Sequence, residues 1–204
     1  MLISLLFENP ISFFMIATSI LFAFTVHEYS HAQVAHSLGD HTPKYKGRLT
    51  LNPVAHIDPL GMILIFIAGF GWGKPVPFNP YNLKEQRWGP GLVALAGPFS
   101  NFIMFLASGF VLRFLSVGNE GLFSFLTIFA WLNLLLGVFN LLPFPPLDGS
   151  HILAALFPSF EGRMTFSGGN IFMILAAVFL MMYFIVPYVL PPIFELVTGQ
   201  SFHL

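Results

Sequence analysis

The sequence has no cysteine and very little charge. Of its 204 residues, only 8% are Asp, Glu, Lys or Arg, whereas 56% are hydrophobic. Soluble domains carry about 25% charged residues, so this chain cannot cover a water-facing surface and is predicted to be a polytopic membrane protein. The absence of Cys excludes a disulfide framework and a thiolate metal site. A metal ion would therefore have to be bound by His and carboxylate side chains.

The chain also lacks a basic tract, a cleavable leader pattern and an internal repeat. Its formal net charge is −1, so nucleic acid is not an expected partner. The segment Met1–Glu8 has no basic region ahead of its apolar residues, unlike a signal peptide. We expect residues 1–204 to form a single intramembrane domain.

Four apolar runs reach the roughly 20 residues that a membrane-spanning helix needs. They are Pro10–Leu38, Gly89–Leu112, Gly121–Leu147 with its helical part ending near Leu142, and a part of Met164–Phe194 that we place at Gly169–Pro187. The predicted fold class is therefore an all-α polytopic membrane protein with about four transmembrane helices.

Two shorter segments are expected to complete the fold. The run Pro59–Gly73 has only 15 residues and is broken by glycine, so it is predicted to be re-entrant or tilted. The segment Tyr45–Ile57 alternates weakly around a turn at Asn52-Pro53, which favours a small membrane-associated β-hairpin.

The first predicted span contains His27-Glu28-Tyr29-Ser30-His31, an H-E-x-x-H motif. Two histidines four residues apart share one face of a helix, so both can bind one metal ion, with Glu28 beside them as a general base. An ionisable cluster inside a membrane is energetically costly, which favours a functional role over chance occurrence.

A catalytic zinc usually has three protein ligands, and Asp148 is the candidate for the third. It follows the prolines that end the third predicted span, where irregular backbone requires a protein-lined or water-filled pocket. A helix cap before His151 is the alternative role for Asp148. Asn140, near the same break, is a candidate catalytic or substrate-binding donor, and equally a structural hydrogen-bonding residue.

The basic residues predict the orientation of the spans. Six of them (Lys44, Lys46, Arg48, Lys74, Lys84 and Arg87) lie between the first two spans, and Arg163 lies between the last two, whereas only Arg113 lies on the other side. This bias places both loops in the cytoplasm. We therefore expect an integral membrane protein with its active site near the cytoplasmic side; the family resemblance described next implies a bacterial or archaeal cell membrane.

Together these motifs resemble the site-2 protease family of intramembrane zinc metalloproteases. The resemblance covers most of the chain and is carried by three motifs: His27-Glu28-x-x-His31, Gly97-Pro98-Phe99-Ser100-Asn101, and Asn140-x-x-Pro143-x-Pro145-x-Leu147-Asp148-Gly149. Two further pieces, Asn52-Pro53…His56-Ile57-Asp58-Pro59 and Gly73-Lys74-Pro75-Val76-Pro77, are similar to the compact bacterial and archaeal branch without PDZ or CBS domains.

The resemblance implies one zinc ion bound by His27, His31 and Asp148, with Glu28 as general base and Asn140 close to the substrate. It also implies a single-pass membrane protein or a membrane-associated regulator as the partner that is cleaved. Because such a substrate must be unwound, the predicted hairpin is a candidate edge strand that would bind it by β-augmentation through Leu49 and Leu51. A hairpin that only caps the helix bundle is an equal alternative. A metal transporter or channel, and a non-cleaving binder of membrane segments, are the alternative functions.

Overall fold

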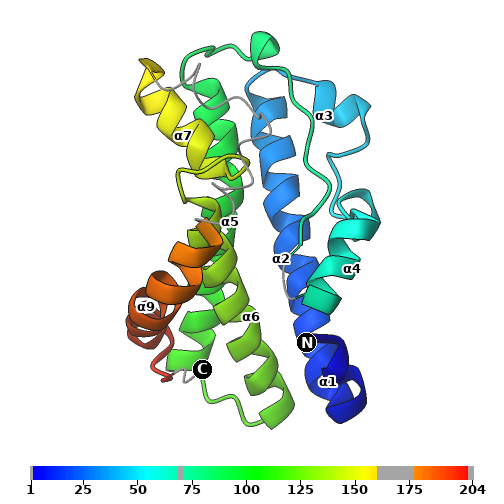
Figure 1. Ribbon diagram of the computed structural model, residues 1–204, viewed down its shortest axis with the longest axis vertical. Helices are drawn as coiled ribbons and strands as arrows, with labels where there is room; N and C mark the ends of the chain where they lie inside the picture. The colour runs from blue at the N-terminus through cyan, green and yellow to red at the C-terminus, as the bar shows by residue number, and fades with distance from the viewer. Residues whose placement is uncertain (1, 69–70, 160–176, 202–204) are drawn as a thin grey trace.

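The protein is built around four long apolar helices. The computed structural model describes residues 2–68, 71–159 and 177–201, and this part of the chain contains helices but no β-strand. The helices long and apolar enough to cross a membrane are α2 (Pro10–Ser37), α5 (Gly89–Phe114), α6 (Glu120–Asn140) and the composite helix Ala177–Thr198 (Figure 1). Over the described residues, the expected all-α architecture is confirmed, with four helices long and apolar enough to span a membrane.

The starts of the long helices follow local capping rules. The Asn9 side chain accepts a hydrogen bond from the Ser12 N–H at the start of α2, and Pro10 occupies its first turn. The Asn119 side chain caps α6 in the same way by accepting from the Leu122 N–H, and Glu120 lies in the first turn. Such caps satisfy backbone donors that have no partner within the helix.

The fourth span ends later than the sequence indicated. Its expected start near Gly169 lies outside the described residues, but its expected end at Pro187 is wrong, because the helix continues to Thr198. Pro187 lies within the π-helix η4 (Met181–Val189), and α9 (Leu190–Thr198) follows directly. Proline lacks an N–H, and a widened π turn is one way in which a helix accommodates the interruption.

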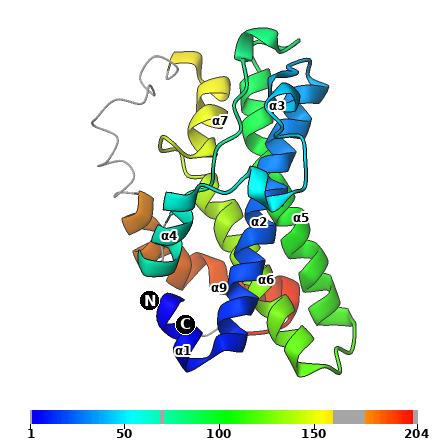
Figure 2. The same cartoon turned by 90° about the vertical axis from the view of Figure 1, so that its right-hand side faces the viewer.

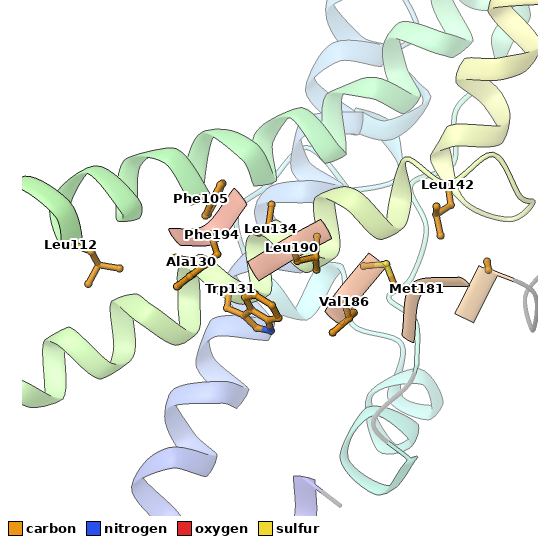
Figure 3. Packing of buried hydrophobic residues seen from close by; sticks show 11 residues of the cluster. Phe105, Leu112, Ala130, Trp131, Leu134, Leu142, Met181, Val186, Leu190 and Phe194 are labelled. Carbon is orange, nitrogen blue, oxygen red and sulfur yellow. The ribbon is translucent and has the colours of Figure 1, made fainter. Parts of the chain in front are cut away.

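Helix α5 lies at the centre of the bundle. It packs against α2, α6 and α9, and also against the short α7 (Asp148–Leu156). A hydrophobic cluster joins α5, α6 and the fourth span through side chains that include Phe105, Trp131, Leu134 and Phe194 (Figure 3). The Phe194 ring contacts those of Phe105 and Trp131 at centroid distances of 6.2 and 5.5 Å.

The short apolar run expected to be re-entrant or tilted forms α4 (Pro59–Ala68), which packs against α1 (Leu2–Glu8) (Figure 2). Ten helical residues are about 15 Å long, half the thickness of the hydrocarbon core. The backbones of Gly61 and Trp72 meet so closely that a side chain at Gly61 would collide with the Trp72 carbonyl. Trp72 therefore lies beside Gly61, near the start of the run.

The predicted β-hairpin at Tyr45–Ile57 is wrong. In its place lie α3 (Thr42–Tyr45), irregular turns and the 3-10 helix η1 (Pro53–Ala55). Local hydrogen bonds replace a strand ladder, since the Arg48 N–H donates to the Pro43 carbonyl and the Asn52 side chain accepts from the Val54 N–H. Proline and asparagine favour these turns more strongly than the weak alternation of apolar residues favours a strand.

Candidate metal centre

Three side chains from two separate helices form a compact group of ligand atoms. His27 and His31 lie one turn apart on α2 and are 3% and 8% exposed, and Asp148 is the first residue of α7. The two Nε2 atoms are 3.0 Å apart, and they lie 3.2 and 3.4 Å from Asp148 Oδ2. The structure thus brings together the three residues that were predicted as metal ligands.

The spacing of these atoms fits a tetrahedral zinc ion. Ligands about 2.0–2.1 Å from zinc at tetrahedral angles are separated from one another by about 3.3 Å. The observed separations of 3.0, 3.2 and 3.4 Å are close to this value. One tetrahedral position would remain for water or substrate, as in catalytic rather than structural zinc sites.

A chain of buried amides fixes the orientation of His27. The Asn133 side-chain amide donates to the Phe129 carbonyl at 2.8 Å, so its oxygen accepts from Asn101 Nδ2 at 3.0 Å. Asn101 Oδ1 in turn lies 2.6 Å from His27 Nδ1, and only a protonated Nδ1 can donate to it. His27 Nε2 therefore keeps its lone pair for a metal, the usual role of a partner behind a histidine ligand.

His31 is oriented by the backbone of α5. Its Nδ1 lies 2.7 Å from the Val93 carbonyl oxygen, an acceptor, so Nδ1 carries the proton and Nε2 is again the metal-facing atom. Gly97, one turn further along α5, allows the close approach of both histidines. A Cβ at Gly97 would lie 2.5 Å from His31 Cε1 and 2.6 Å from His27 Cε1, distances that real side chains do not tolerate.

Asp148 faces the histidines and not the end of its own helix. Leu147 is the N-cap residue of α7 and makes no side-chain cap, whereas Asp148 Oδ2 is buried without a hydrogen-bond donor. Gly149 permits this placement, because a Cβ there would collide with the carbonyls of Leu141 and Leu142. A buried carboxylate oxygen that has no donor and faces two nitrogen lone pairs is suited to bind a cation.

Glu28 is buried beside the ligands on α2, with 9% of its surface exposed. Its Oε2 accepts a hydrogen bond of 3.1 Å from the Val76 N–H, which belongs to the extended segment between α4 and α5. A carboxylate next to a metal-facing histidine is placed to accept a proton from water at the open position.

The other predicted residues are placed differently. Asn140 donates to the Leu136 carbonyl within its own helix, 3.0 Å away, as the structural alternative anticipated. Leu49 is half-buried and Leu51 is 59% exposed, and the edge strand on which their substrate role depended is not formed. The pair His36–His41 and the His56–Thr50 contact hold further histidines away from the cluster.

Sequence reasoning gave no role to Asn101, Asn133 or Val76. A signal existed for the two asparagines, because each is an amide in an otherwise apolar predicted span, where unpaired polar groups are costly. Both are fully buried. No comparable signal existed for Val76, whose backbone and not its side chain makes the contact.

The sequence is similar to a peptidase family and to proteins named as zinc metalloproteases. The sequence model of Peptidase family M50 matches residues 116–184. A Bacillus subtilis (strain 168) protein named "Putative zinc metalloprotease YwhC" is 45% identical over 148 residues, which cover 69% of this chain and 68% of the relative. "Putative zinc metalloprotease Rip2" of Mycobacterium tuberculosis (strain H37Rv) is 34% identical over 185 residues, which cover 86% of this chain and 68% of the relative.

An archaeal relative extends the comparison. "Putative zinc metalloprotease MJ0611" of Methanocaldococcus jannaschii is 31% identical over 137 residues, covering 64% of each chain. No solved structure matches the chain significantly.

An H-E-x-x-H helix completed by a carboxylate, inside a bundle of apolar helices, is the arrangement of a membrane-embedded zinc metalloprotease. The chain belongs to peptidase family M50, the site-2 protease family.

Proposed function

We propose that this protein is an intramembrane zinc endopeptidase that hydrolyses peptide bonds in or near transmembrane segments of membrane-protein substrates. The observation that carries the proposal is the buried group of His27 Nε2, His31 Nε2 and Asp148 Oδ2, which has tetrahedral spacing and lies beside Glu28. Its place among four apolar helices favours a substrate that approaches within the bilayer. That substrate would be a single-pass membrane protein or a membrane-associated regulator.

Different residues of the chain would bind the metal and transfer the proton. His27, His31 and Asp148 would hold one zinc ion, and their Nδ1 partners keep both imidazoles in the metal-binding tautomer. When bound, zinc supplies Lewis-acid chemistry, lowering the pKa of a water to about 7 and polarising a peptide carbonyl. Glu28 would accept a proton from the attacking water and return it to the nitrogen of the departing amine. Asn140, the last residue of α6 before the loop that leads to Asp148, is a candidate substrate-binding residue.

The excess of basic residues between α2 and α5 supports a site on the cytoplasmic side of the membrane. Lys44, Lys46, Lys84 and Arg87 all lie in exposed parts of this connection, beyond the end of α2 that carries the histidines.

Glu28→Gln separates the protease from the alternatives. The purified variant and the parent protein are incubated in proteoliposomes with a membrane-tethered substrate, and zinc content is measured on the same samples. We expect the variant to retain zinc and to lose cleavage, because glutamine preserves shape but cannot accept the proton. Equal cleavage by both proteins would refute the role of Glu28. Zinc flux into the liposomes without cleavage would indicate a transporter, and substrate binding without cleavage by either protein would indicate a binder.

A further inference from the structure

The segment Gly73–Asn79, here called the strap, runs in an extended conformation from the α4 region past α2 toward the start of α5 (Figures 1 and 2). Pro75 and Pro77 have no N–H, so Val76 supplies the only backbone donor over three residues. That donor is directed at Glu28 Oε2, 3.1 Å away. The sequence Pro-Val-Pro thus presents one isolated N–H group to the carboxylate beside the metal ligands.

A buried arginine fixes the strap on one side of Val76. Arg48 is 6% exposed, and its guanidinium donates to the carbonyls of Ala55 and Lys74. The Lys74 N–H donates to the His56 carbonyl at 2.8 Å. These bonds tie the strap to the turns that follow α3, two residues before Val76.

A buried aspartate fixes the other side. Asp40 is fully buried, and it accepts from the Asn79 N–H at 2.6 Å and from the Asn82 side chain at 2.9 Å. Burial would raise the pKa of Asp40, but hydrogen bonds from Thr42, Asn82 and Asn79 together hold it below its ordinary value. The ionised Asp40 side chain, just after the end of α2, therefore holds the strap at Asn79, three residues after Val76.

We propose that the Val76 backbone N–H is a positioning group for the general base Glu28, and that the strap exists to hold it there. This inference rests on the proposed role of Glu28. A glutamate has three side-chain torsions, and a fixed donor on Oε2 restricts them, leaving Oε1 as the oxygen that takes the proton. The donor is rigid because both of its flanks are anchored by buried charges.

The same contacts engage three backbone donors of the strap. The N–H groups of Lys74, Val76 and Asn79 are directed to His56, Glu28 and Asp40, toward the protein interior. A peptide that added to an edge here would find these donors already used.

The test compares Val76→Pro with Val76→Ala. Both variants lose the valine side chain, but only proline also removes the N–H. Steady-state cleavage of a membrane-tethered substrate gives kcat and KM, and zinc content is measured in parallel. We expect kcat of V76P to be about 10- to 100-fold below that of V76A, the usual cost of losing an outer-shell partner, with similar KM and equal zinc.

A backbone edit keeps the test decisive if three consecutive prolines disturb the strap. Replacing Val76 by its α-hydroxy analogue converts the amide to an ester, which removes the N–H and keeps the side chain. We expect the same loss in kcat. Equal kcat with and without the N–H would overturn the inference, and a higher kcat without it would show that the bond is an inhibitory latch instead. Full activity of Glu28→Gln would instead defeat the proposed function, so the two failures are distinguishable.

Discussion

Helices α5 and α6 pack against each other in two zones with opposite character. In the polar zone, Asn101 is hydrogen-bonded both to Asn133 and to His27. About one turn further along α5, Phe105 begins the apolar zone, where Trp131, Leu134 and Phe194 pack together (Figure 3). Both zones are almost fully buried.

The difference separates the group that serves the metal from the group that holds the helices together. In the polar zone each amide satisfies the next, and the last hydrogen bond fixes a metal ligand. In the apolar zone the side chains contribute packing without directional bonds. Substitutions in the first zone should change metal affinity, and substitutions in the second should change stability. The following predictions test that division, from the largest expected effect to the smallest.

Asp148→Asn should cause the largest change in metal binding. The amide keeps the shape of the side chain but removes the negative charge that faces the two histidines. We expect zinc affinity to fall by more than the roughly 10- to 100-fold typical of outer-shell partners. Competition with a chromogenic chelator measures the affinity. Asp58→Asn, which removes a carboxylate that accepts from the Gly61 N–H, is the matched control. Retention of parental affinity by D148N would contradict its role as a ligand.

Phe194→Ala should cause the largest loss of stability. Its ring is fully buried between Phe105 and Trp131, so truncation leaves a cavity. We expect about 3–5 kcal/mol of destabilisation, measured by unfolding in detergent micelles. Zinc affinity of the folded variant should match that of the parent. A loss of zinc under conditions where the variant remains folded would show that the two zones are not independent.

Asn101→Ala should reduce zinc affinity about 10- to 100-fold, equivalent to about 1.4–2.7 kcal/mol, because His27 loses the acceptor that sets its tautomer. Calorimetric titration with zinc measures the effect. Ser108→Ala is the matched control, since Ser108 is buried on the same helix and bonds only to carbonyls of its own helix in the contacts described. Equal zinc affinities of N101A and S108A would show that Asn101 and Asn133 do not contribute to zinc binding.

Asp40→Asn should cause the smallest effect, a destabilisation of about 1 kcal/mol, because one of the accepting oxygens is replaced by a donor. The pKa of Asp40 is lowered on folding, so its stabilisation is complete above the unfolded value of about 3.9. It is lost as the pH falls through the lower folded pKa. Unfolding curves of the two proteins should therefore converge below about pH 4. If the difference in the free energy of unfolding persisted unchanged at lower pH, Asp40 would not be the ionised anchor of the strap.

The parts of the structure with strong local signals were predictable. Helices α2, α5 and α6 follow from apolar length and from caps such as Asn9 and Asn119, and the pair His27–His31 follows from helical period. The β-hairpin predicted at Tyr45–Ile57 was wrong because proline and asparagine favour turns there more strongly than the weak alternation favours strands. The predicted end of the fourth span was wrong because Pro187, which usually breaks a helix, is accommodated in a π-helix.

The sequence by itself determined that this is a membrane protein with an H-E-x-x-H helix, because charge content and helical period are properties of adjacent residues. Only the tertiary structure decided that Asp148 reaches the histidines, that Asn101 and Asn133 orient His27, and that the Val76 N–H meets Glu28. These contacts join residues from 32 to more than 100 positions apart, and they depend on close approaches at Gly97 and Gly149. Helix packing sets such approaches, and no local pattern encodes them.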